Sequence, residues 1–231
     1  FGLSASMHPA KEVGGDFYDF FLIDQDHCGV VIADVSGKGV PAALFMMRVK
    51  ALLNQLLRED LSPDQVLARA NDGLCEDNEA GMFVTVWLGV LDLRSGKLVY
   101  ANGGHNPPLY RHADGSVEWM RDRSGLLLGS FEGVPYRVFE RTMIRGDSLI
   151  LYTDGVTEAM DASDHCYGDE RLFQLVEREC DGYPASVSGV IEEDVRAFAE
   201  GADQADDITL LVLRYDGQEN GPAASAAGNR G

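Results

Sequence analysis

Acidic residues stand at the ends of several apolar runs in this sequence, next to glycine or to another acid. Asp16 lies in VGGDFYDF, Asp34 in VIADVSGKG and Asp154 in LILYTDG, while Asp206 and Asp207 open DDITLLV. If these runs are strands of one sandwich, their acidic ends can converge. Converging carboxylates without basic partners repel each other, so they need raised pKa values or a bound cation. Oxygen ligands favour hard cations such as Mg²⁺, Mn²⁺ or Ca²⁺ over zinc.

Each of these acids also has a simpler interpretation. Asp154 with Gly155 is a common turn dipeptide, and Asp16 follows two glycines in a similar way. The pair at 206–207 fits the cap of a solvated edge strand. Asp34 is harder to explain in this way because it follows apolar or small residues, where an unpaired carboxylate costs about 1–3 kcal/mol. Taken together, the four positions favour a metal cluster over four unrelated turns.

Two strands must position the first of these acids. Residues 17–23 are aromatic and apolar, and residues 28–35 (CGVVIADV) form a continuous run of the buried type. The acidic and polar turn at 24–27 predicts that the two strands form a hairpin.

Two helices are expected after this hairpin. Pro41 opens the first, which runs to residue 60 with apolar residues at the 3.6-residue period of a core-facing helix, at 44, 45, 49, 52, 53, 56 and 57. Ser62 and Pro63 are the N-cap and first position of the second.

The rest of the sequence predicts mainly antiparallel strands separated by turns such as Arg94-Ser95-Gly96. The expected strands are 82–93, 97–101, 108–112, 116–120, 136–143 and 148–152. Helical patterns follow at 169–179 and 185–199, and the strand 208–215 closes the domain. This order indicates an α+β fold with antiparallel sheets and segregated helices.

The charge balance excludes one broad class of function. The 231 residues carry 38 acids against 19 Lys and Arg, a formal net charge of −19. Nucleic acids and anionic membranes attract the opposite charge, so neither is an expected partner. The acidity is concentrated in residues 154–207, which hold 16 Asp and Glu against three Arg.

Other features indicate a cytoplasmic piece of a longer protein. The four cysteines lack metal-type spacing, which favours reduced thiols, and no apolar run is long enough for a membrane span. Because the chain begins with Phe1, we expect upstream sensor or regulatory domains to be missing. Residues 1–215 are expected to form one domain, and 216–231, rich in Gly and Ala, a disordered tail or linker.

Six ordered blocks resemble one family. They are VGGDFYDF, ADVSGKGVPAALFMM, MFVTVWLGVLD, ANGGHNPPLY, GDSLILYTDGVTEA and DDITLLVL, and they span about residues 7–214. Together they resemble the bacterial sporulation-protein-E-type phosphatases, stress-response members of the metal-dependent PPM (protein phosphatase 2C-like) class. The resemblance implies an αββα sandwich of two antiparallel sheets flanked by helices, with two Mn²⁺ or Mg²⁺ ions at one edge.

The resemblance also implies roles for individual residues. Asp16 and Asp34 would be metal ligands, with Asp34 bridging, and the carbonyl of Val35 would be the backbone ligand. Asp154 and Asp206 would complete the shell of the first metal. Asp206 is favoured over Asp207 as the ligand, because the family's ligand is the first residue of this pair, and Asp207 would orient waters or its neighbour. Asp34 and Asp154 are the expected catalytic residues, acting through the metals.

The sequence departs from the family's eukaryotic branch at three places. Ser36 stands where that branch has a His proposed as general acid, and a serine hydroxyl is a poor acid. Lys38 is a candidate phosphate contact or a solvated turn lysine. His105 stands where some relatives have a third-metal Asp, and either lines the substrate groove or caps a turn.

The leading hypothesis is a phosphoserine/phosphothreonine protein phosphatase. The resemblance implies a substrate of the anti-sigma-factor-antagonist type. The departures at Ser36 and His105 keep open an alternative, a catalytically weak or switched regulatory binding module on the same fold. A two-metal nuclease is disfavoured by the negative charge.

Overall fold

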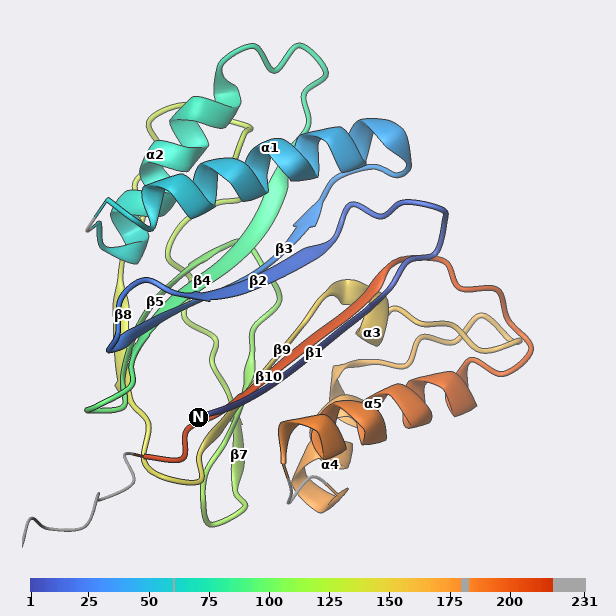
Figure 1. The fold of residues 1–231 in the computed structure, drawn as a ribbon. Coiled ribbons are helices and arrows are strands. Elements are labelled where there is room, and N and C mark those ends of the chain that lie inside the picture. The colour runs from blue at the N-terminus through green and yellow to red at the C-terminus, as the bar shows by residue number, and fades with distance from the viewer. Residues whose placement is uncertain (60, 180–182, 218–231) are drawn as a thin grey trace, which may run out of the picture.

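Two five-stranded antiparallel sheets face each other in a computed structural model of the chain, with helices on both outer faces (Figure 1). The structure describes residues 1–59, 61–179 and 183–217. The two facing sheets with helices on their outer faces confirm the expected αββα sandwich. The tail predicted from residue 216 lies almost wholly outside the described residues, as does Cys180.

One sheet has the strand order β2-β3-β4-β5-β8. Its strands are β2 (Phe17–Leu22), β3 (His27–Val35), β4 (Val84–Asp92), β5 (Lys97–Gly103) and β8 (Phe139–Thr142). The helices α1 (Val40–Leu56) and α2 (Pro63–Cys75) cover its outer face (Figure 1). The predicted hairpin is present as β2 paired with β3.

The other sheet has the order β1-β10-β9-β6-β7. Its strands are β1 (Gly2–His8), β10 (Ile208–Arg214), β9 (Ser148–Tyr152), β6 (Leu109–Arg111) and β7 (Val117–Trp119). Its outer face carries α4 (Asp169–Glu179) and α5 (Pro184–Phe198), and the single turn α3 (Asp154–Thr157) follows β9.

The two sheets and the two pairs of helices make four layers. Three clusters of buried apolar residues fill the spaces between them. In β3, Val31 and Ala33 pack toward α1 and α2, whereas Val30 and Ile32 pack between the sheets. Strand β10 also has two buried faces, one toward the other sheet and one toward α4 and α5. A strand buried on both faces reads as a continuous apolar run, which explains why these two segments were predicted as strands.

The elements differ from expectation in a few places. Strand β1 was not predicted, and neither was α3. The strand expected at 136–143 is ordered as a strand only over Phe139–Thr142, and the first helix ends at Leu56. No helix among the described residues is both long and apolar enough to cross a bilayer.

Candidate metal centre

Four aspartates meet at one edge of the sandwich, two from each sheet. Asp16 directly precedes β2 and Asp34 is the penultimate residue of β3, so the register Phe17–Ala33 places these two acids opposite each other. Asp154 begins α3 at the end of β9, and Asp206 lies two residues before β10. The predicted convergence of strand ends therefore occurs, through antiparallel pairing within each sheet and packing between the sheets.

Asp16 is held by hydroxyl groups of the opposite sheet. It is 2% exposed, and its Oδ2 accepts hydrogen bonds from Thr153 Oγ1 at 2.6 Å and Thr209 Oγ1 at 2.7 Å. Burial raises the pKa of Asp16 to about 7, although the two hydroxyls act in the opposite direction. These threonines were missed in the sequence, where the only signal was a polar residue at the end of each apolar run.

Asp34 lies among the other acids. Burial, followed by the negative charges of Asp16 and Asp154, raises the pKa of Asp34 to about 9. The pKa of Asp154 is also raised, first by burial and then by Glu158 and Asp206. Carboxylates held this close without a neutralising cation take up protons instead. This cluster of carboxylates therefore lacks neutralising positive charge.

Lys38 supplies one positive charge at the rim of this cluster. Its Nζ lies 2.8 Å from Asp206 Oδ2 and donates a hydrogen bond of 2.6 Å to the carbonyl of Ala205. The Asp206 carboxylate raises the pKa of this ammonium group. Both side chains are about four-tenths exposed, so the ion pair is open to solvent and to exchange for another cation.

Asp207 is used differently from its neighbour. Its carboxylate accepts hydrogen bonds from the backbone N–H of Ala10 at 2.9 Å and of Gly15 at 2.8 Å. A side chain at Gly155 would come within 1.9 Å of the Asp207 carbonyl, so only glycine permits this approach. Asp207 therefore fixes the loop that carries Asp16, while the Asp206 carboxylate faces a replaceable ammonium group.

Val35 and Ser36 continue the strand that carries Asp34. A side chain at Gly15 would lie 2.8 Å from the Val35 carbonyl oxygen, so glycine lets this carbonyl sit beside the residue that precedes Asp16. Ser36 is bound to the backbone of Phe83, with its N–H donating to the carbonyl and its Oγ accepting from the N–H, both at 2.9 Å. The Ser36 Oγ thus acts as a hydrogen-bond acceptor for the backbone of Phe83.

His105 lies in the interior and not in an open groove. It is 6% exposed, its Nδ1 is 2.8 Å from Thr85 Oγ1, and the Asn102 side chain bonds its backbone N–H and carbonyl. Burial lowers the pKa of His105 to about 4, so the ring is neutral. This placement favours a structural role, through Thr85, which pairs with Asp34 across the sheet. Substrate contact by His105 is an untested prediction.

The donor set fits a hard cation. Asp16, Asp34, Asp154, Asp206 and the Val35 carbonyl offer oxygen alone, the chemistry that Mg²⁺ and Mn²⁺ prefer. In the part of the chain that the structure describes, no three His, Cys, Asp or Glu side chains already converge closely enough to hold an ion. The Asp16 and Asp34 side chains are hydrogen-bonded to each other, and Lys38 engages Asp206. An ion would therefore bind with rearrangement of these side chains.

Comparison with known proteins identifies a family whose model matches most of the chain. The family model for stage II sporulation protein E matches residues 24–216. The phosphoserine phosphatase RsbU of Bacillus subtilis (strain 168) is 30% identical over 212 residues, which are 92% of this chain and 62% of RsbU. The chain thus spans less than two thirds of that relative.

Solved structures share the fold. The SiaA-PP2C domain of Pseudomonas aeruginosa matches with a TM-score of 0.80 and 22% identity, covering 93% of this chain and 86% of the SiaA chain. A crystal structure of RsbX in complex with magnesium matches with a TM-score of 0.67 and 15% identity, covering 91% and 94%. At these identities the likeness concerns the fold alone.

Proposed function

The chain belongs to the stage II sporulation protein E family, and from that premise we propose that it is a metal-dependent phosphoserine/phosphothreonine protein phosphatase. The family model covers most of the chain, and the relative RsbU is named a phosphoserine phosphatase. The observation that carries the proposal is the cluster of Asp16, Asp34 and Asp154, whose raised pKa values mark a deficit of positive charge.

Two divalent ions, Mn²⁺ or Mg²⁺, are the proposed cofactors. Asp34 would bridge them, with Asp16, Asp154, Asp206 and the Val35 carbonyl as further ligands. The magnesium in the RsbX structure supports this choice of ion. Bound ions would supply Lewis acidity, which lowers the pKa of a water and stabilises charge on a phosphoryl group.

The chain's own residues prepare this chemistry by fixing ligands. Thr153 and Thr209 orient Asp16 from the opposite sheet, and Asp207 holds the loop before it through Gly15. Ions held by ligands that are fixed in this way would need less reorganisation when charge develops on the phosphoryl group. Because a serine hydroxyl is a poor acid, the proton for the leaving group would come from a group other than Ser36.

The proposed substrate is a small protein phosphorylated on Ser or Thr, of the anti-sigma-factor-antagonist type. The match covers 62% of RsbU. Sensing or regulation is proposed to lie in further domains, outside the segment that corresponds to this chain. The proposed setting is the cytoplasm, without insertion into a membrane.

The test is phosphate release from p-nitrophenyl phosphate and from a phosphoserine peptide, with Mn²⁺ and with a chelator. We expect turnover that requires Mn²⁺ and that Asp34→Asn abolishes. Asp114→Asn, in the exposed turn before β7, is the matched control and should retain full activity. Absence of turnover with Mn²⁺, or full turnover by Asp34→Asn, would contradict the proposal.

The ion pair between Lys38 and Asp206 favours one alternative, a switched regulatory module on the same fold. In that case the resting chain would bind a protein partner with little turnover. Asp154→Asn separates the two functions, because partner binding alone would survive this substitution. Loss of turnover without loss of a physiological response would support the alternative.

A further inference from the structure

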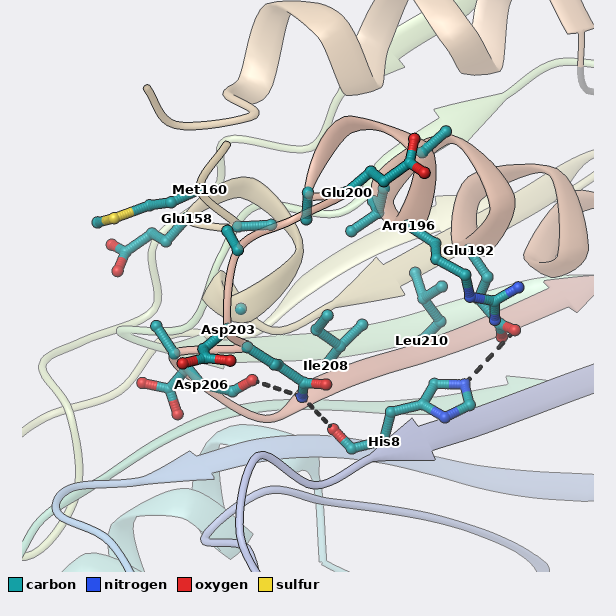
Figure 2. A pocket seen from close by; sticks show the side chains of 18 of the residues that line it. His8, Glu158, Met160, Glu192, Arg196, Glu200, Asp203, Asp206, Ile208 and Leu210 are labelled. Carbon is teal, nitrogen blue, oxygen red and sulfur yellow. Dashed lines mark hydrogen bonds and ion pairs between the residues drawn. The ribbon is translucent and has the colours of Figure 1, made fainter. Parts of the chain in front are cut away.

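A cavity of about 790 Å³ adjoins the candidate metal centre (Figure 2). It begins at Lys38, Gly155 and Asp206, and it continues beneath α5 toward His8 at the end of β1. Its volume is typical of sites that hold a drug-sized ligand, which corresponds to a few residues of a peptide. A chain segment lying in it would reach the metal centre directly.

The floor and the rim of the cavity differ in chemistry. Ile208 and Leu210 of β10 form an apolar floor (Figure 2). Val195 of α5 also lines the cavity. The rim is acidic, with six carboxylates: Glu158, Glu192, Glu193, Glu200, Asp203 and Asp206. An apolar floor under an acidic rim suits the aliphatic stem and charged end of lysine or arginine.

Most of these rim charges are unneutralised. Asp206 binds Lys38, and Glu192 is 3.5 Å from His8 and also bonds Ser6. Among the described residues, the other four carboxylates have neither a hydrogen bond nor an ion pair. Arg196 lies one helical turn from Glu192 on α5, at the end of the cavity away from Asp206 (Figure 2).

We propose that this cavity binds a basic segment of the phosphoprotein substrate, next to the phosphorylated residue. The inference rests on the proposed phosphatase function and adds a specificity determinant to it. Glu193, Glu200 and Asp203 would contact Lys or Arg side chains, while the apolar floor would hold their stems or a neighbouring apolar residue.

The charge of the substrate gives the physical reason. A phosphoserine carries about −1.5 to −2 charges at neutral pH, and an acidic rim repels it. Basic residues beside the phosphoserine reverse the sign of that interaction and draw the segment toward the metal centre. The cavity would thus discriminate between phosphoproteins by the residues around the phosphate.

The experiment compares three phosphoserine peptides that differ only in carrying Lys, Ala or Glu at two to four residues on each side of the phosphoserine. We expect kcat/KM for the Lys peptide to exceed that for the Glu peptide about tenfold at low salt, with the difference shrinking as salt is added. The variant Glu193→Gln/Glu200→Gln/Asp203→Asn should lose most of this preference and keep its turnover of p-nitrophenyl phosphate.

The matched control is Glu79→Gln/Glu132→Gln/Glu177→Gln, which removes the same charge from three exposed positions outside the cavity. We expect it to keep the preference. Loss of preference in both triple variants would assign the effect to the overall electrostatic field of the chain. It would overturn the proposal that the cavity binds the basic segment. Equal rates on all three peptides would also overturn it.

A binding measurement separates this inference from the proposed function. Fluorescence anisotropy with the labelled Lys peptide requires no turnover. Tight binding that the cavity variant weakens about tenfold supports the cavity even if no substrate is hydrolysed. Mn²⁺-dependent turnover of p-nitrophenyl phosphate, with peptide binding that the cavity variant does not weaken, would overturn the proposed role of the cavity. The proposed phosphatase function would remain supported.

Discussion

Strand β9 has an aspartate at each end, and the two contrast in what surrounds them. Asp147 directly precedes the strand and Asp154 follows it by two residues. Asp147 is 2% exposed, and its oxygens accept hydrogen bonds from Tyr110 Oη at 2.5 Å, Ala113 N–H at 2.8 Å and Ile144 N–H at 2.9 Å. The chain itself satisfies this carboxylate.

At the opposite end Asp154 has fewer such partners, the backbone N–H of Gly155 and, through charge alone, Lys38. The groups that act on Asp154 include the negative charges of Glu158 and Asp206, and burial raises its pKa further. The contrast shows that burial of an aspartate alone does not indicate a site. A carboxylate such as Asp147, with both oxygens taken by donors, is part of the scaffold, whereas one that faces other acids indicates a missing cation.

The largest expected effect is on activity at the acidic end. Asp154→Asn should lower Mn²⁺-dependent kcat/KM for p-nitrophenyl phosphate by about 100-fold or more, because it removes a charged ligand. In chelator, its melting temperature should stay equal or rise, since one repelling charge is gone. Retention of activity within about threefold would remove Asp154 from the centre.

The second effect is on stability at the other end. Asp147→Asn puts an amide NH₂ among three donors, so at least one buried group loses its partner at a cost of about 1–3 kcal/mol. Urea unfolding should report this loss, with turnover per folded molecule unchanged. Wild-type stability of this variant would show that the contrast between the two ends is wrong.

The third effect is a pH dependence of the metal-free protein. The pKa values of Asp16 and Asp34 are raised to about 7 and about 9, so the folded state holds protons that the unfolded state releases. Their contribution to stability is complete below the unfolded pKa near 4 and is lost as pH rises through 7 to 9. Urea unfolding in chelator between pH 5 and 9 should show this decline.

Asp34→Asn is the control for that experiment because it removes the group with the higher pKa. It should flatten the decline, most clearly above pH 7. An equally steep decline in the variant and the wild type would mean that Asp34 does not titrate in this range.

The smallest effect concerns the cation that the chain itself supplies. Lys38→Ala should strengthen Mn²⁺ binding up to about fivefold in calorimetry, because the ion no longer competes with an exposed ion pair worth under about 1 kcal/mol. Lys97→Ala breaks a similarly exposed pair with Glu140 at 2.9 Å, between β5 and the edge strand β8, and should leave Mn²⁺ affinity unchanged. Weaker binding by Lys38→Ala would identify the lysine as an aid to metal binding.

The sequence predicted most of the strands and helices because their burial patterns are local. It missed β1, since GLSASMH has few large apolar residues and the strand is an edge that pairs only with β10. It missed α3 because a single turn beginning at Asp154-Gly155 has the composition of a loop. The arrangement of strands in two sheets depends on contacts between distant segments, which no local pattern contains.

For the candidate site, the sequence predicted where the aspartates lie but not what each side chain contacts. Strand-end placement was enough to predict that Asp16, Asp34 and Asp154 lie near one another. The roles of the neighbouring residues Asp206 and Asp207 depend on which backbone each side chain faces, and only the structure shows Asp207 bound to Gly15. The engagement of Ser36 by Phe83 likewise depends on a contact across 47 residues of sequence.

The candidate centre draws two of its four carboxylates from each sheet, and this has a mechanical consequence. Asp16 and Asp34 move with one layer, Asp154 and Asp206 with the other, and the apolar contacts between the layers have no fixed direction. An ion held by both halves would act as a removable cross-link that resists shear. Resistance to proteolysis would then rise with metal occupancy, and the two sheets would be hardest to separate when the ion is bound.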